Sequence, residues 1–110
     1  MSAFPGVRVS SQSVSPPIII DMSVPPYFIP SANYSLGLIC TVSAGASLTY
    51  SVQVTADQFP SSDGNWNNHD VLVNQVSSAN SNIATPVTGV RLNVTTYASG
   101  SVNLGIAKWP

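Results

Sequence analysis

Apolar and polar residues alternate strictly in three segments of the chain. The segments are residues 48–56 (LTYSVQVTA), 90–95 (VRLNVT) and 102–107 (VNLGIA). Because successive side chains of a strand point to opposite faces, this period of two predicts strands with one face in a core. A short reversal at residues 97–101 separates the last two segments, and Gly100 can adopt the positive φ that such a loop needs. We therefore expect residues 86–109 to form a β-hairpin that closes the edge of a small β-sandwich.

A second hairpin is expected earlier in the chain. Residues 36–42 (LGLICTV) form a short apolar run, which is typical of a strand buried on both faces. Residues 43–47 have the composition of a turn, so the run is expected to pair with residues 48–56. A polar loop over 57–70, a short strand over 71–73 and a polar connection over 77–82 follow. No helical period is present, and the pattern predicts an all-β fold, a small antiparallel β-sandwich of jelly-roll-like form.

Residues 1–30 differ from the rest because they hold six of the nine prolines. This density forbids a helix and interrupts any central strand. The segment is also rich in apolar, β-branched residues, which leaves two interpretations open. It forms either irregular edge strands over its own sandwich or an extended arm across a neighbouring subunit. We divide the chain into an extended N-terminal arm, 1–30, and a sandwich domain, 31–110, and expect partner contacts from the apolar residues of the arm: Ile18, Ile19, Ile20, Tyr27, Phe28 and Ile29.

Charge is unusually scarce, at 6% of residues with a formal net charge of −1. Ser, Thr and Asn supply the polarity instead, and a surface of this kind does little to keep copies apart. The composition therefore favours a subunit of an assembly, and it lacks the clustered Lys and Arg that nucleic acid requires. No signal-peptide start and no apolar run near 18 residues is present, so neither secretion nor membrane insertion is expected.

Two clusters of polar residues are candidate sites. Asp63–Asn67 carries oxygen ligands at alternate positions, but a calcium loop needs Gly and Glu where Asn68 and Asn74 stand. We interpret these residues as turn formers. His69 beside Asp70 could form a general base with its carboxylate, yet neighbours in an extended segment point to opposite faces. His69 is therefore expected to be hydrogen-bonded within a loop.

The remaining motifs also indicate structure rather than catalysis. Cys40 cannot form an internal disulfide because it is the single cysteine, and its apolar setting predicts a small core residue. The two glycosylation patterns at Asn33 and Asn93 are treated as coincidence in a chain rich in Asn and Ser. No zinc, phosphate-loop or dinucleotide motif is present. We expect no enzyme activity, no catalytic residue, no metal and no cofactor.

Three stretches carry a resemblance to a known group of proteins: SVQVTAD, WNNHDVL and PVTGVRLNVTTYASGSVNLGIAKW. Over about residues 48–109 the chain resembles a small β domain recurrent among structural proteins of tailed bacteriophages. Its size and proline-rich arm are most similar to the capsid cement, or decoration, proteins of short-tailed phages. The resemblance carries no functional residues over, because the matching motifs are structural.

The resemblance implies a virion protein that is made in the bacterial host cytoplasm and located on the capsid surface. Its expected partners are the major capsid protein and a second copy of itself, as a homodimer, without nucleic acid or membrane. The alternative is a tail or fibre module of the virion that binds carbohydrate, in which Trp66, Tyr97 or Trp109 stacks on a sugar. Copy number in the particle separates the two.

Overall fold

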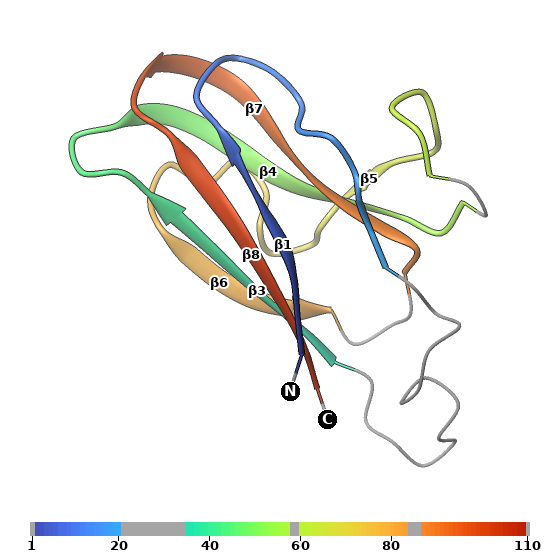
Figure 1. Cartoon of the computed structure of the whole chain (residues 1–110). Helices are drawn as coiled ribbons and strands as arrows, with labels where there is room; N and C mark the ends of the chain where they lie inside the picture. The colour runs from blue at the N-terminus through green and yellow to red at the C-terminus, as the bar shows by residue number, and fades with distance from the viewer. Residues whose placement is uncertain (1, 21–34, 58–59, 84–86, 110) are drawn as a thin grey trace.

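The computed structural model describes residues 2–20, 35–57, 60–83 and 87–109 (Figure 1). These residues form eight strands and no helix, and so contain no helix that could cross a membrane. The strands are β1 (Ser2–Val9), β2 (Ile18–Ile19), β3 (Ser35–Val42), β4 (Ser47–Thr55), β5 (Asn67–Asn68), β6 (Ala79–Ile83), β7 (Gly89–Ser99) and β8 (Val102–Trp109).

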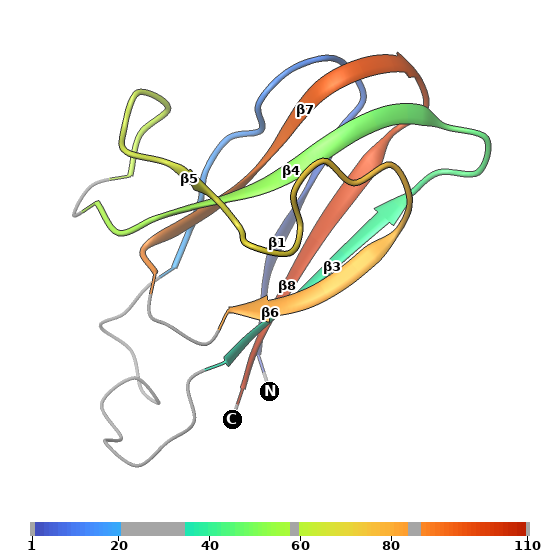
Figure 2. The ribbon, with the colours of Figure 1, turned by 180° about the vertical axis from the view of Figure 1, so that it is seen from behind.

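The strands make two four-stranded antiparallel sheets that pack face to face (Figures 1 and 2). The front sheet has the order β1-β8-β3-β6, and the back sheet has the order β2-β7-β4-β5. Three of the pairs join an early strand to a late one, β1–β8, β2–β7 and β3–β6, and a fourth joins the consecutive strands β4 and β5. Consecutive described strands lie in different sheets, except for β4 and β5. The expected all-β sandwich is confirmed.

The core lies between the two sheets and follows from the alternation in the sequence. The inward residues of the four central strands are almost completely buried. They are Leu36, Leu38 and Cys40 of β3, Leu48, Tyr50 and Val52 of β4, Val90, Leu92 and Val94 of β7, and Val102, Leu104 and Ile106 of β8. Each aliphatic side chain buried in this way contributes about 1.5–3 kcal/mol.

Both expected hairpins are wrong. β7 pairs with β4 and β2, β8 pairs with β1 and β3, and the turn at Gly100 is an arch that carries the chain between sheets. The same holds for β3 and β4, which lie in different sheets. A period of two specifies which face of a strand is buried. A hairpin within one sheet and an arch between two sheets bury the same residues. The pattern therefore predicts the strands but does not specify their neighbours.

The two arches lie against each other at one end of the sandwich. The Ser43 N–H donates to the Ser101 carbonyl at 2.9 Å, and the Ser101 N–H donates to Ser43 Oγ at 3.0 Å. Gly100 has a φ of 89°, and a Cβ there would lie 2.2 Å from Ala46 Cβ. Glycine is therefore needed at this position for two reasons: it tolerates the positive φ, and no Cβ would fit beside Ala46.

Two shorter elements also differ from expectation. Residues 71–73 form bends rather than a strand. Residues 71–75 nevertheless lie along β4, because the Val52 N–H donates to the Leu72 carbonyl and Tyr50 forms a bridge with Gln75. The expected polar connection at 77–82 instead contains most of β6. β6 reads ANSNI and buries only Ile83 fully, so its apolar signal is too weak to identify a strand from the pattern.

The division at residue 30 needs correction over the described residues 2–20. β1 and β2 are edge strands of the two sheets, and Val9, Ile18 and Ile20 belong to the shared core. Edge positions tolerate proline, which explains why this segment can join the sheets. The interpretation as edge strands over the protein's own sandwich is therefore correct for residues 2–20. Residues 21–30 lie outside the described part of the chain, as do Tyr27, Phe28 and Ile29.

The contact between the arches predicts different effects for two glycines of positive φ. Gly100→Ala should lower the free energy of unfolding by about 2 kcal/mol or more, because strain and overpacking add. Gly45→Ala is the matched control: its φ is 75°, but nothing lies within 4 Å of an added Cβ, so strain alone should cost about 1 kcal/mol. Urea unfolding of both variants measures the difference. Equal losses would contradict the packed arrangement of the arches.

Candidate functional site

The outer face of the front sheet is a candidate interaction surface. Because Leu36, Leu38 and Cys40 point into the core, the intervening residues of β3 point outward. Ile39 stands near the centre of this face with 51% of its surface exposed, opposite Gly105 of β8 and Asn80 of β6. We use the name outer face for these outward positions of the front sheet: Arg8, Gly37, Ile39, Thr41, Asn80, Asn82, Asn103 and Gly105.

Two hollows lie beside Ile39. One, of about 390 Å³, lies toward β1 and is lined by Gly6, Arg8, Ile39, Thr41, Asn103 and Gly105, among others. The other, of about 260 Å³, lies toward β6 and includes Ser78 and Asn80. Gly105, which lies opposite Ile39 on β8, leaves room for the larger hollow because it has no side chain. The face thus combines an apolar projection with adjoining space.

Arg8 is the only charged residue on the outer face among the described side chains. Its Nε donates a hydrogen bond to Asn103 Oδ1 at 2.9 Å. A sheet face without carboxylates and with one cation has a small desolvation cost when another surface covers it. This arrangement can bind a macromolecular surface, but it offers no group for acid–base or nucleophilic chemistry.

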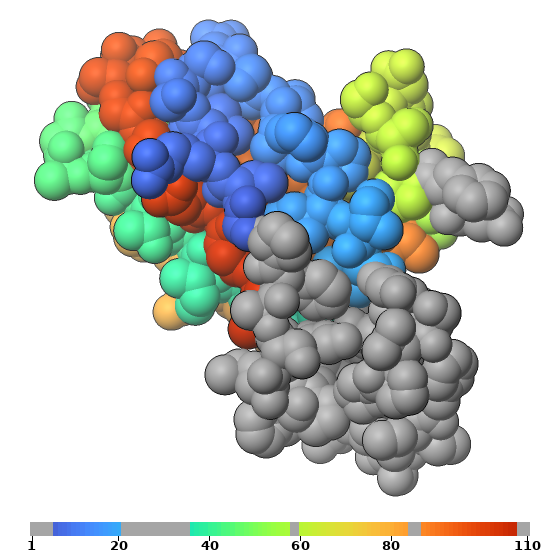
Figure 3. All heavy atoms as spheres, in the orientation of Figure 1, coloured from blue at the N-terminus to red at the C-terminus, as the bar shows by residue number. Residues whose placement is uncertain are grey.

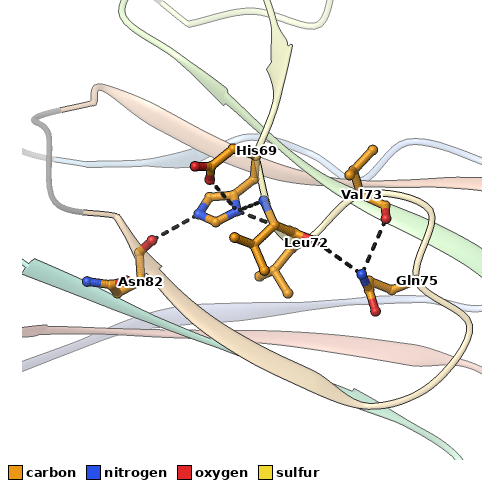
Figure 4. A network of polar contacts seen from close by, with 7 residues as sticks. His69, Leu72, Val73, Gln75 and Asn82 are labelled. Carbon is orange, nitrogen blue, oxygen red and sulfur yellow. Dashed lines mark hydrogen bonds and ion pairs between the residues drawn. The ribbon is translucent and has the colours of Figure 1, made fainter.

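His69 has a structural role, as the sequence predicted for it. Its side chain is buried, its Nε2 donates to the Asn82 carbonyl at 2.9 Å, and its Nδ1 accepts from the N–H groups of Val71 and Leu72, each at 3.1 Å (Figure 4). The imidazole therefore joins the β5–β6 connection of the back sheet to an edge strand of the front sheet. With both ring nitrogens occupied, it has no free position to act as a base.

Asp70 does not complete a catalytic pair. Its Oδ1 lies 3.4 Å from His69 Nδ1, and its side chain is 89% exposed. Since Nδ1 accepts two backbone hydrogen bonds, it has no proton to give the carboxylate. The two residues are close, but the contact is not the hydrogen bond that orients a general base.

Cys40 lies in the core beside Tyr50. Burial raises the pKa of the Cys40 thiol to about 11, and a hydrogen bond with Tyr50 offsets part of this shift. Burial also raises the pKa of Tyr50, whose hydroxyl donates to the Ser77 carbonyl at 2.8 Å. A thiol that stays protonated and covered is not a nucleophile. Cys40 is a core residue, as expected.

A cluster of polar contacts joins the β4–β5 loop to β4 and β7. Arg91 lies over the Trp66 ring at 4.3 Å from its centroid, and its Nε donates to Gln53 Oε1 at 2.8 Å. Trp66 Nε1 donates to the Ser61 carbonyl at 2.7 Å. The cluster fixes the loop over the end of the back sheet, where Trp66 packs close to Gly89.

The calcium-like segment contributes to the same loop. Asp57, rather than Asp63, is the carboxylate that organises it, because both of its oxygens accept hydrogen bonds from Asn65, at 2.8 and 3.3 Å. These bonds lower the pKa of Asp57. No group of three or more potential metal ligands occurs within the described ranges. The role of Asp57 was not apparent in the sequence, since its partner lies eight residues away.

The expected partner-binding residues fall into three groups. Ile18 and Ile20 are buried in the protein's own core, so their side chains offer no free surface. Ile19 points the other way and is 54% exposed. Tyr27, Phe28 and Ile29 lie outside the described residues. The sequence did not predict that Ile39 is exposed, because the apolar run of residues 36–42 is typical of a strand buried on both faces.

Two aromatic residues of the carbohydrate-binding alternative are already engaged. Arg91 covers one face of the Trp66 ring, and the Tyr97 hydroxyl donates to the Gly100 carbonyl at 3.0 Å. Nothing is described of the Trp109 side chain. A sugar platform needs an open ring face with hydrogen-bonding groups around it. One face of Trp66 is covered by Arg91, and Tyr97 packs partly against the core.

The hydrogen bonds of His69 predict a loss of stability on substitution. His69→Ala should lower the free energy of unfolding by about 2–3 kcal/mol, because it leaves buried backbone groups without partners. Asp70→Ala, the exposed neighbour, should change it by less than about 0.5 kcal/mol. Chemical denaturation measures both. A stable His69→Ala variant that has lost its biological activity would instead identify His69 as a functional residue.

The thiol of Cys40 predicts a loss of stability at alkaline pH. The unfolded thiol releases its proton near its ordinary pKa of 9.0, whereas the folded protein holds it to about 11. The folded state therefore binds more protons in this range, and the free energy of unfolding should fall by about 1 kcal/mol between pH 8.5 and 10. Cys40→Ala should reduce this slope. An equal slope in both proteins, measured by denaturation at each pH, would contradict the assignment.

Comparisons with known proteins leave the chain without an assigned family. A scan against protein-family models finds no match, and searches of curated proteins and of solved structures also find none. A function for the chain is therefore argued from its residues and their geometry.

Proposed function

We propose that the protein is a non-enzymatic structural component of a bacteriophage virion. It binds the outside of the capsid as a decoration, or cement, protein, and its partner is the major capsid protein. The observation that carries the proposal is the strand order, considered together with the resemblance in the sequence. The uncharged outer face of the front sheet supplies the binding surface.

The strand order supports a jelly roll as the finer description of the fold. A jelly roll has eight strands in two sheets with Greek-key connections, and it is frequent in viral capsid proteins. Here the numbers of the paired strands β1–β8, β2–β7, β3–β6 and β4–β5 each add to nine. This is the result of rolling one long antiparallel ribbon onto itself, which is how a jelly roll is wound.

The outer face suits repeated, modest contacts on a shell. Ile39 would enter an apolar recess of the capsid protein, and the polar amides around it would bond at the rim. Many identical sites on one particle make weak binding sufficient for full occupancy when one protein contacts two subunits at once. Ile19 offers a second, smaller contact on the back sheet.

The alternative is a tail or fibre module that binds carbohydrate, since lectin domains also use the jelly roll. It has less support, because Arg91 covers one face of Trp66 and Tyr97 packs partly against the core. Quantifying the protein in purified particles distinguishes the two: a decoration protein is present in hundreds of copies, and a tail part in at most a few tens.

The test of the binding surface compares two isoleucines of equal exposure. Ile39→Asp should reduce co-sedimentation with undecorated capsids at least tenfold, because a buried unpaired carboxylate opposes docking. Ile19→Asp, on the back sheet, should reduce it less than threefold. Both side chains are about half exposed, so both variants should still fold, which unfolding curves check.

Point variants are needed here because removing residues 1–30 would remove β1 and β2 from the sheets. If Ile19→Asp strongly reduced co-sedimentation and Ile39→Asp did not, the capsid contact would lie on the N-terminal segment, as the sequence predicts. Full binding by both variants would contradict the outer face as the docking surface.

A further inference from the structure

β6 differs from the other three edge strands of the sandwich. Exposed sheet edges pair with other chains unless proline, charge, a bulge or short length prevents it. β1 carries Pro5, Arg8 and an irregularity between Phe4 and Val7, whereas β2 and β5 have two residues each. β6 has five residues, and neither proline nor a charged residue occurs among them. Among the described sheets it is the one edge without any of these four devices. Only its end at Ser81–Ile83 is covered in part, by residues 68–71.

The hydrogen-bond alternation shows which backbone groups β6 leaves open. Ser43 donates toward β8, and Val42 donates to Ser78 Oγ on the β6 side, so the even-numbered residues of β3 bond to β6. Their partners in register are Ala79, Ser81 and Ile83. In an antiparallel ladder the alternate residues, Asn80 and Asn82, then direct their N–H and C=O groups away from β3.

His69 occupies one of these groups and leaves the others. Its Nε2 bonds the Asn82 carbonyl, which agrees with the outward direction of that residue. Among the described residues, no hydrogen bond engages the N–H or C=O of Asn80. Asn80 is therefore the open centre of an edge that His69 caps at one end.

The surroundings of this edge are apolar and nearly neutral. Val71, on the connection that leads into β6, is 54% exposed and lines a hollow together with Ser81, Asn82 and Ile83. Residues 71–83 contain no charged side chain. Figure 2 shows this connection running between β4 and β6. Asp70 lies at the Asn82 end of the edge, but the centre of the edge at Asn80 lies in a segment without charge, so repulsion does not oppose pairing there.

From this edge we infer that two copies of the chain pair through β6. The strands run antiparallel about a two-fold axis, with Asn80 opposite Asn80 of the second copy. Each Asn80 N–H donates to the other Asn80 carbonyl, which satisfies the outward N–H and C=O of both Asn80 residues. The contact is isologous and closes at two copies. Joining the front sheets in this way gives one eight-stranded sheet, whose outer face carries two Ile39 side chains.

The dimer would form whether or not the protein binds a capsid, so it is tested with the isolated protein. Paired residues that exchange both hydrogen bonds have Cα atoms about 5.5 Å apart, within the range that a disulfide spans. Asn80→Cys should therefore give a covalent dimer under mild oxidation. Thr41→Cys is the matched control, because Thr41 is exposed on the same face of an interior strand. Cys40 is buried and should not react.

Two further variants separate pairing from folding in sedimentation equilibrium. Asn80→Pro removes the donor that faces the second copy, and Asn80→Lys places two cations opposite each other; each should weaken dimerisation at least tenfold. Thr41→Lys adds the same charge away from the edge and should leave the dimer affinity unchanged. Unfolding curves should confirm that all variants fold. A monomer at several hundred micromolar, species larger than dimers, or a dimer indifferent to Asn80→Pro would overturn the inference.

Discussion

The packing of four central strands against one another is the interaction on which the rest of the structure depends. β3 and β8 of the front sheet bury Leu and Ile side chains against those of β4 and β7 in the back sheet. Because the chain crosses between the sheets at almost every connection, the turns must span the sandwich and pack at its ends. This explains why Gly100 and the Ser43–Ser101 hydrogen bonds lie where two arches meet, and why His69 ties the edge of the back sheet to the front sheet.

The sequence predicts the class of the fold and the long strands, because strict alternation over residues such as 48–55 and 90–94 has a single physical explanation. It does not predict which strands are neighbours. A hairpin and an arch use the same short glycine-containing turn and bury the same side chains, so pairing depends on contacts between distant segments. β6 escapes prediction for a related reason: a strand of Asn and Ser is held by backbone hydrogen bonds to β3, which leave no apolar pattern.

The candidate surface was predictable only in part. The exclusion of His69 as a base followed from the geometry of extended chains, and the structure adds the partners that occupy its ring nitrogens. The exposure of Ile39 could not be read from residues 36–42, since apolar residues of a central strand are usually covered on both faces. The scarcity of charge in the sequence explains the character of this surface. The outer face and the β6 edge carry few charges, so charge does not prevent other proteins from binding there.

Imaging of decorated particles by cryo-electron microscopy tests the central claim most directly, namely that this sandwich is a capsid-binding subunit that docks through its front sheet. The account predicts density for the protein at repeated positions over the shell, with the outer face around Ile39 against the capsid protein. Density restricted to the tail, or contact with the shell through the back sheet alone, would contradict it.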